Sequence, residues 1–196
     1  MNEEIGKLYT AAENEHFPVM RRETAKALAA LVREKKPNEI LEIGTCLGVS
    51  ALHMLFAYDK CRLTTVEKDE TTYIRAKDTF ARCKVSNRVT VINGDCNEVF
   101  GYLKGNVYDL IVLDGPKSSI PTQYEESLSL LRVGGTIFID DVNYHDMLQS
   151  DFAPHKQRTI ITALKAFKEK LKNDDRVTVT FNDTEDGFAV ITKIKE

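Results

Sequence analysis

The stretch ILEIGTCLGVSAL, residues 40–52, runs from an apolar segment through a turn bracketed by two glycines into a second apolar segment. Residues 39–44 are short and mostly apolar, as expected of a strand buried on both faces. Gly44 and Gly48 let the backbone turn tightly and approach a ligand closely, while the following helix N-terminus offers free N–H groups. The stretch therefore predicts a strand–turn–helix unit of an open α/β sheet, in which ligands bind outside the carboxyl ends of the strands.

The alternation of short apolar strands with helices continues along the chain. Further strands are expected at residues 62–67, 88–94, 108–115 and 135–141, and helices at 22–34, 50–58, 69–83, 97–103 and 122–132. Alternating strands and helices predict right-handed crossovers and a parallel sheet. A long helix over 158–172 then precedes two strands, 176–182 and 187–194, which read as an antiparallel pair at the sheet edge.

The expected fold is thus α/β, a doubly wound, seven-stranded, mostly parallel sheet with an antiparallel C-terminal hairpin. One domain should comprise residues 1–196, with N-terminal helices in 1–36 and the core in 37–196, because single cores of roughly 100 to 250 residues are common.

Composition narrows the class of protein. The four cysteines are far apart and form no C-x-x-C pair, which is typical of reduced thiols in a cytoplasmic protein. No apolar run approaches the roughly 20 residues needed to span a bilayer, so no membrane partner is expected. The net charge of −3 gives no general attraction to nucleic acid, although a local basic patch remains compatible with it.

The ligand of the opening turn is expected to carry little or no phosphate. The spacing does not match the dinucleotide fingerprint G-x-G-x-x-G, and no G-K-[ST] follows to hold a triphosphate. Glu67 ends the second strand, where an acid can accept hydrogen bonds from a ribose diol. Asp95, in NGDC after the third strand, could mark the adenine end of the same crevice. Taken singly, each of these residues also fits an ordinary turn or strand end.

A second group of polar residues follows the fourth and fifth strands. Asp114 ends the fourth strand, and Asp140 and Asp141 end the fifth, so three carboxylates should meet beside the cofactor crevice. Carboxylate oxygens suit Mg²⁺, which could lower the pKa of a hydroxyl nucleophile and fix its position. Lys117 could act as a base or stabilise an oxyanion. The alternatives are a turn or helix cap for the aspartates and a solvated side chain for Lys117.

The pattern LEIGTxxGxSAL, the acid ending the second strand and the GD after the third together resemble the cation-dependent O-methyltransferases that use S-adenosylmethionine, including catechol O-methyltransferase. The resemblance covers nearly the whole chain and implies a Rossmann-like class I methyltransferase fold. It implies that S-adenosylmethionine is surrounded by the residues Glu42, Gly44, Ser50, Glu67, Asp95, Cys96 and Asp114.

The carboxylate group fits the same resemblance. The family motif D-x-x-K matches Asp114 and Lys117, which are the implied catalytic residues. The motif D-N-V matches Asp140, Asp141 and Val142, so Asp114, Asp140 and Asp141 are the implied ligands of Mg²⁺ or Mn²⁺. One position departs from the pattern, because Asp141 stands where family members usually carry Asn. The additional negative charge could tighten cation binding, shift the metal preference or change how the third ligand works.

Three segments resemble the bacterial branch that methylates 5-hydroxyuridine in tRNA. They are EHFPVM at 15–20, in which Met20 matches a position over the cofactor, PHKQRTIITALKAF at 154–167, and DTEDGFAVITK at 183–193. The expected reaction is therefore methylation of 5-hydroxyuridine to 5-methoxyuridine, with tRNA phosphates held by the candidate patch His155, Lys156, Arg158, Arg21 and Arg22. The second segment is less basic than in that branch, and Glu185 stands where the branch has a glycine.

Other functions remain open. The best enzyme alternative is a small-molecule O-methyltransferase acting on catechol-like phenols, which needs an apolar wall over the metal rather than an open mouth with basic flanks. A binding module that has lost its chemistry is a hypothesis from another class, motivated by Asp141 and opposed by Asp114, Lys117 and Asp140. A dehydrogenase is disfavoured by the missing G-x-G-x-x-G. The family resemblance also implies a homodimer.

Overall fold

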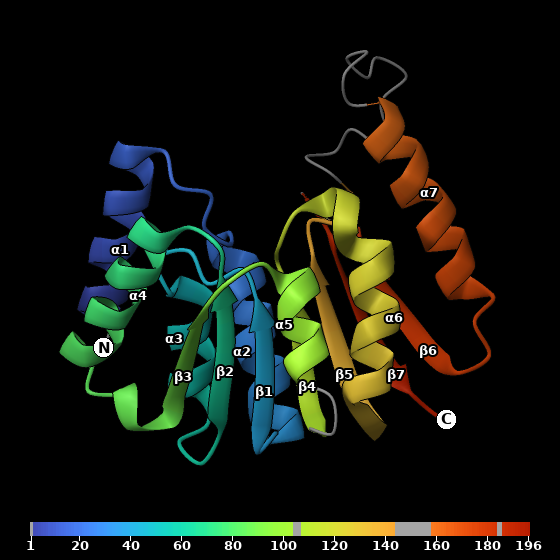
Figure 1. The fold of residues 1–196 in the computed structure, drawn as a ribbon, viewed down its shortest axis with the longest axis horizontal. Helices are drawn as coiled ribbons and strands as arrows, with labels where there is room; N and C mark the ends of the chain where they lie inside the picture. The colour runs from blue at the N-terminus through green and yellow to red at the C-terminus, as the bar shows by residue number, and fades with distance from the viewer. Residues whose placement is uncertain (1, 104–106, 144–157, 184–185) are drawn as a thin grey trace. The chain divides into compact units, whose positions relative to one another are not determined.

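The computed structural model describes residues 2–103, 107–143, 158–183 and 186–196. Contacts divide the chain into two compact units, Met1–Lys104 (unit 1) and Gly105–Glu196 (unit 2). Figure 1 shows the helices and strands of both. The expected single domain stays a prediction, and each unit is described by itself below.

Unit 1 contains three parallel strands and the helices around them. The strands are β1 (Glu39–Ile43), β2 (Arg62–Glu67) and β3 (Val89–Asn93), in the order β3-β2-β1. The helices are α1 (Asn2–Glu15), α2 (Arg22–Lys35), α3 (Val49–Ala57), α4 (Glu70–Arg82) and α5 (Cys96–Tyr102), with a 3-10 turn, η1, at Ser86–Arg88. The register places Glu42 beside Thr65 and Glu67 beside Asn93, so polar side chains occupy matching positions near the strand ends.

Local chemistry explains where these helices begin and end. α2 buries an apolar stripe that includes Leu28 and Val32, both 0% exposed, and it packs against α3. It ends at Lys36, which takes a left-handed conformation (φ 49°) directly before Pro37, a residue that disfavours helix in its predecessor. α4 begins at Asp69, whose side chain caps the helix by accepting a hydrogen bond from the backbone N–H of Thr72.

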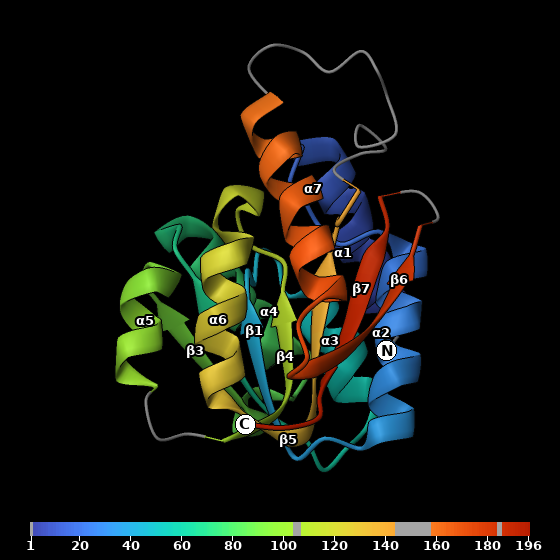
Figure 2. The same ribbon diagram turned by 90° about the vertical axis from the view of Figure 1, so that its right-hand side faces the viewer.

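Unit 2 holds the remaining four strands. They are β4 (Tyr108–Leu113), β5 (Leu131–Asp140), β6 (Val177–Asn182) and β7 (Phe188–Lys193), in the order β4-β5-β7-β6. The β4–β5 pair is parallel, whereas β7 runs antiparallel to both of its neighbours. Besides the 3-10 turn η2 (Lys117–Ser119), the helices are α6 (Ile120–Leu130), which packs on β4 and β5, and α7 (Arg158–Lys172), which contacts β6 (Figure 2).

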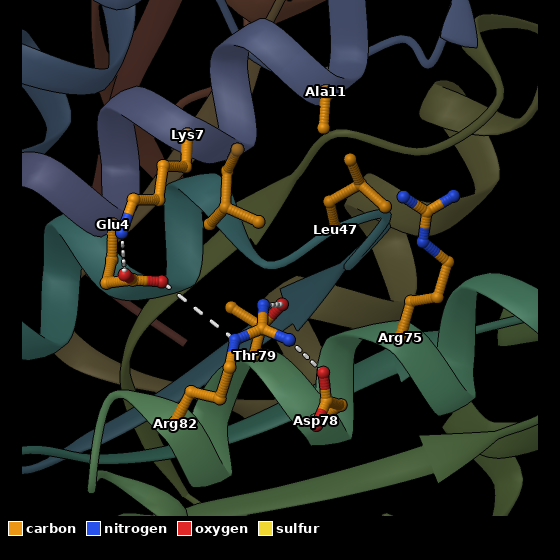
Figure 3. A pocket seen from close by; sticks show the side chains of 9 residues that line it. Glu4, Lys7, Ala11, Leu47, Arg75, Asp78, Thr79 and Arg82 are labelled. Carbon is orange, nitrogen blue, oxygen red and sulfur yellow. Dashed lines mark hydrogen bonds and ion pairs between the residues drawn. The ribbon is translucent and has the colours of Figure 1, made fainter.

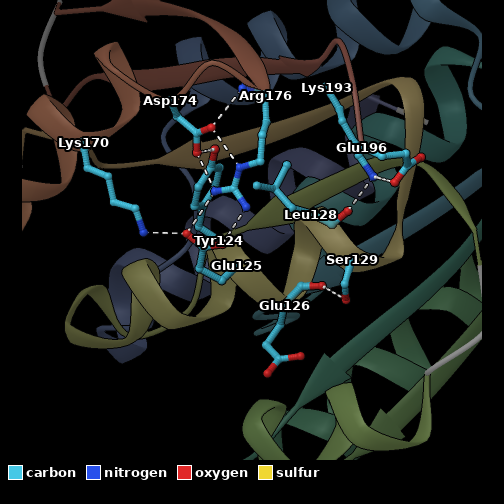
Figure 4. Close-up of polar contacts among 10 residues, drawn as sticks. All are labelled: Tyr124, Glu125, Glu126, Leu128, Ser129, Lys170, Asp174, Arg176, Lys193 and Glu196. Atoms are coloured by element: carbon cyan, nitrogen blue, oxygen red, sulfur yellow. Dashed lines mark hydrogen bonds and ion pairs between the residues drawn. The ribbon is translucent and has the colours of Figure 1, made fainter.

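A polar cluster holds α6, the end of α7 and β6 together within unit 2 (Figure 4). The hydroxyl of Tyr124 donates to Asp174 over 2.9 Å, and Arg176 pairs with both Asp174 and Glu125. Lys170 completes the cluster through Glu125. None of the residues in this cluster is a candidate site residue, so we assign the cluster a structural role.

The seven predicted strands are all present, and their bounds differ from expectation mainly at β5. This strand begins at Leu131 instead of residue 135. Its partners on β4 pass from Tyr108 opposite Leu131 to Leu110 opposite Thr136, so Arg132–Gly135 form an irregularity in the ladder. Gly134 accommodates it with a φ of 84°. α6 begins two residues early because Pro121 fits the first turn of a helix.

Candidate active site

The opening turn, residues 44–48, links β1 to α3 through three left-handed residues. Gly44 has a φ of 98°, Cys46 of 47° and Gly48 of 84°. At Gly48 an added Cβ would lie 2.9 Å from the ring of Phe80, which is 1% exposed. A larger residue would therefore meet both backbone strain and a buried ring. The predicted close turn is present, and α3 starts directly after it with Val49.

Glu42 lies beneath this turn and is completely buried. Ser50 Oγ donates to one of its carboxylate oxygens over 2.6 Å, and Thr65 Oγ1 donates to the other over 2.6 Å. Thr65 Oγ1 is also 2.6 Å from the hydroxyl of Thr45. Burial raises the pKa of Glu42 to about 7, because the two hydroxyl hydrogen bonds offset the desolvation of the charge only in part. Glu42 thus joins β1, β2 and the first turn of α3.

Glu67 organises the turns that follow β1 and β2. Its Oε2 accepts a hydrogen bond from the backbone N–H of Cys46 over 2.7 Å, and its Oε1 accepts from the N–H of Asp69 over 2.9 Å. Each carboxylate oxygen has two lone pairs, so both retain capacity for a further donor such as a ribose hydroxyl. The half-buried side chain is therefore compatible with the role that the sequence predicts for it.

The remaining cofactor candidates of unit 1 lie at element ends. Asp95 caps α5 by accepting from the N–H of Asn97, and its other oxygen accepts from Lys68 Nζ over 2.9 Å. The hydrogen bond from Lys68 lowers the pKa of Asp95. Cys96, the first residue of α5, is half-buried, whereas Met20 is 3% exposed in the segment before α2. The predicted place of Met20 over the cofactor stays a prediction.

In unit 2, Lys117 is held between two elements of the predicted carboxylate group. Its Nζ donates to Asp114 Oδ1 over 3.3 Å and to the backbone carbonyl of Asp140 over 3.1 Å. Burial by itself lowers the pKa of Lys117, but the charges of Asp114, Asp140 and Asp141 outweigh burial and raise the pKa. The amine is therefore a partly buried ammonium, which can stabilise a developing oxyanion.

Asp140 ends β5 and Asp141 follows it directly, and both side chains are buried. Asp140 is 7% exposed and accepts a hydrogen bond from the backbone N–H of Asp141 over 2.8 Å. Burial, followed by the negative charge of Asp114, raises the pKa of Asp140 to about 8. Asp141 has a φ of 55°. Among residues other than glycine, Asn and Asp adopt this conformation most readily, so this backbone accommodates Asp141 as well as the Asn that the resemblance leads us to expect there.

The chemistry of these oxygens fits a hard divalent cation, because buried carboxylates crowded together gain from a neutralising ion. Across the described parts of the chain, no group of three or more His, Cys, Asp or Glu side chains is placed to hold a metal ion. The structure sets Lys117 against Asp114 instead, so the predicted metal ligands remain a prediction.

A cavity of about 380 Å³ opens between α1 and α4 in unit 1 (Figure 3). It is lined by Glu4, Lys7, Leu8, Ala11, Leu47, Arg75, Asp78, Thr79 and Arg82. Its basic groups have acidic partners: Lys7 lies 2.9 Å from Glu4, Arg82 pairs with Asp78, and Arg75 pairs with Glu15. None of the predicted site residues lines it, so we do not assign it to the cofactor.

Some residues that hold the candidate cofactor residues in place could not be identified from sequence motifs. Thr65 and Thr45 complete the Glu42 network, and Lys68 neutralises Asp95. The register of β1 against β2, which pairs Glu42 with Thr65, would have indicated the role of Thr65.

Of the predicted tRNA patch, Arg21 and Arg158 are exposed and Arg22 lies 3.9 Å above the ring of Tyr9. The patch residues His155 and Lys156, and Glu185 in the C-terminal motif, lie outside the described residues.

None of the helices in the described ranges is both long and apolar enough to cross a membrane.

Comparison with known proteins places the chain in one family along almost its full length. A family model described as O-methyltransferase matches residues 3–194. Curated relatives include a caffeoyl-CoA O-methyltransferase of Populus kitakamiensis, 23% identical with 99% of this chain and 85% of that protein covered. Another is the catechol O-methyltransferase domain-containing protein 1 of Mus musculus, 25% identical with 96% and 72% covered.

Solved structures agree on the fold. A caffeoyl-CoA O-methyltransferase homologue from Staphylococcus aureus superposes with a TM-score of 0.90 at 29% identity, covering 96% of this chain and 91% of that one. An O-methyltransferase from Bacillus cereus, solved with S-adenosylhomocysteine, gives a TM-score of 0.86 at 23% identity, with 97% and 90% covered. The predicted Rossmann-like methyltransferase fold and enzyme class are thereby confirmed, and the chain belongs to the O-methyltransferase family.

Proposed function

We propose that the protein transfers the methyl group of S-adenosylmethionine to a hydroxyl of a small aromatic molecule, with Mg²⁺ or Mn²⁺ as the second cofactor. The observation that carries the proposal is the partly buried ion pair of Lys117 and Asp114, at the D-x-x-K positions of an O-methyltransferase chain. A partly buried ammonium beside carboxylates is an arrangement suited to an oxygen nucleophile that must lose a proton.

Unit 1 would bind the cofactor. The first turn of α3 presents free backbone N–H groups, which favour an anionic end such as the methionine carboxylate. Glu67 fixes the neighbouring turns through the N–H groups of Cys46 and Asp69 and keeps lone pairs for the ribose diol. The cofactor would therefore bind to a preorganised surface, which reduces the ordering cost of binding.

Unit 2 would handle the acceptor. Lys117, held by Asp114 and by the carbonyl of Asp140, is positioned to stabilise the negative charge that develops on the acceptor oxygen. Asp114, Asp140 and Asp141 are the residues that would hold the cation. When bound, Mg²⁺ or Mn²⁺ lowers the pKa of a hydroxyl and orients it for transfer.

The names of the relatives favour a phenolic acceptor. Caffeoyl-CoA and catechol, the compounds in those names, both carry neighbouring aromatic hydroxyls, and a catechol-like phenol is accordingly the first candidate. The second candidate is 5-hydroxyuridine in tRNA, supported by the three sequence segments and by the exposed Arg21 and Arg158. A homodimer and a cytoplasmic location belong to the same proposal.

An experiment in which both candidate acceptors compete for the methyl group decides between the phenol and the tRNA nucleoside. The purified full chain is incubated with methyl-labelled S-adenosylmethionine and Mg²⁺, together with a catechol, a caffeoyl thioester and tRNA that contains 5-hydroxyuridine. Products are separated by mass spectrometry, with an EDTA control. We expect label on a phenolic oxygen. Label on the tRNA nucleoside would establish the second candidate, and cofactor binding without label on any acceptor would favour a binding module.

A further inference from the structure

The hydroxyl groups around Glu42 form a network in which every proton direction is fixed by the neighbour. Ser50 and Thr65 each donate to one oxygen of the Glu42 carboxylate over 2.6 Å. A hydroxyl has one proton, so Thr65 cannot also donate to Thr45, and the 2.6 Å contact between them must use the proton of Thr45. Two hydroxyl protons, those of Ser50 and Thr65, therefore point toward Glu42, and the proton of Thr45 points toward Thr65.

This arrangement determines what the turn can offer a ligand. With Glu42 ionised, Ser50 and Thr45 have only lone pairs left, so their hydroxyls can accept hydrogen bonds and cannot donate. A proton added to Glu42 would reverse one branch of the network. Glu42 would then donate either to Ser50 or to Thr65. In the first case the Ser50 hydroxyl could turn its own proton toward a ligand. In the second case the Thr65 hydroxyl would turn its proton toward Thr45, and the Thr45 hydroxyl could turn its proton toward a ligand.

The first turn of α3 attracts an anion, and an anion needs donors. We propose that Glu42 takes up a proton when the carboxylate of an amino-acid-type ligand binds at the opening turn, so that Ser50 or Thr45 becomes a donor to that carboxylate. Glu42 is then a positioning residue whose protonation determines whether a hydroxyl of the opening turn donates a hydrogen bond to the cofactor or can only accept one. The inference rests on the proposed function, because it requires the methionine end of the cofactor at this turn.

Burial and charge support this assignment. The side chain of Glu42 is 0% exposed, so the charge of its carboxylate is fully desolvated. Within the described residues, the charged group that acts on Glu42 is Glu67, whose negative charge favours the protonated form. The pKa of about 7 places the carboxyl where a bound anion can shift it. An anionic ligand nearby would raise that pKa further.

The test is titration calorimetry of the full chain with S-adenosylhomocysteine at about pH 8, in buffers of different ionisation enthalpy, which gives the number of protons bound per ligand. We expect uptake that approaches about one proton, and affinity that falls about tenfold for each pH unit above 7. The comparison ligand is 5′-methylthioadenosine, which keeps the nucleoside and lacks the amino-acid end. It should bind without proton uptake.

Variants assign the uptake to Glu42. Glu42→Gln should abolish the uptake, whereas Glu39→Gln, at the exposed start of the same strand, should leave it unchanged. Should Glu42→Gln fail to fold, the two-ligand comparison in the unsubstituted protein still decides the matter. S-Adenosylhomocysteine binding without proton uptake would overturn the inference and leave the proposed function intact. Absence of S-adenosylhomocysteine binding would overturn both.

Discussion

Lys117 and Asp114 form an ion pair in which Nζ donates to Oδ1 over 3.3 Å while the side chains are only 15% and 17% exposed. The pair joins the end of β4 to η2, and its second contact, to the carbonyl of Asp140, reaches the end of β5. One ammonium thereby connects all the elements that carry the predicted acceptor chemistry.

Lys117→Met should lower the rate of methyl transfer while leaving cofactor affinity unchanged. Removal of one positioned electrostatic group from an enclosed site costs on the order of 10²–10³ in turnover. Steady-state kinetics and calorimetry with S-adenosylhomocysteine measure the two effects separately. Lys165→Met, on the exposed face of α7, is the matched control. Turnover of Lys117→Met equal to that of the control would remove Lys117 from the mechanism.

Glu67→Ala should weaken cofactor binding by about 10- to 100-fold. The substitution leaves the N–H groups of Cys46 and Asp69 without their charged partner and removes the acceptor for the ribose, and hydrogen bonds to charged groups contribute about 1.5–3 kcal/mol. Glu70→Ala, at the exposed start of α4, controls for the loss of one negative charge. Calorimetry that gave the same affinity for both variants would show that Glu67 does not contact the cofactor.

Gly48→Ala should destabilise the protein more than Gly134→Ala does. Both glycines have a φ of 84°, so both substitutions incur the left-handed penalty of about 1–2 kcal/mol. At Gly48 the new Cβ also meets Phe80 at 2.9 Å, whereas nothing lies within 4 Å of the new Cβ at Gly134. The unfolding free energy from urea titration should therefore fall by about 1–3 kcal/mol more at Gly48. Equal losses would mean that the Phe80 ring moves aside freely.

The stabilising contribution of Glu42 should depend on pH in a defined direction. Its pKa is about 7 in the folded protein against an ordinary value of 4.5, so the folded state binds the additional proton between these values. The contribution is full below about pH 4.5 and is lost as the pH rises through about 7. Relative to Glu42→Gln, the unfolding free energy should fall by about 3 kcal/mol across this window. A difference that stays constant with pH would show that Glu42 titrates normally.

Much of the architecture follows from sequence periodicity. α7 has the predicted bounds, and β1 and β2 agree with prediction to within one residue, because their apolar patterns and flanking turn residues are unambiguous. The start of β5 was not predictable, since the sequence pattern extended the preceding helix to residue 132, whereas Leu131 already pairs with Tyr108 of the neighbouring strand β4. Irregular pairing of this kind depends on a partner strand that a local pattern does not contain.

The places of Glu67, Asp114 and Asp140 at or next to strand ends were predictable from motifs, and their roles in a site stay predictions. The site was not predictable where function depends on strand register or on burial. Thr65 acts through its place beside Glu42, and the raised pKa of Glu42 results from complete enclosure, neither of which is visible in a motif. The left-handed backbone of Asp141 likewise became apparent only in three dimensions, and it explains how Asp can occupy the position of the family's Asn.

The most direct test of the central claim is transfer of a labelled methyl group from S-adenosylmethionine to a catechol, measured by mass spectrometry for the unsubstituted protein and for Asp114→Ala. We predict label on a phenolic oxygen with Mg²⁺, loss of label with EDTA, and no label with folded Asp114→Ala, whose circular dichroism spectrum should match that of the unsubstituted protein. Transfer by Asp114→Ala at a rate near that of the unsubstituted protein, or transfer unaffected by EDTA, would contradict the carboxylate and metal mechanism.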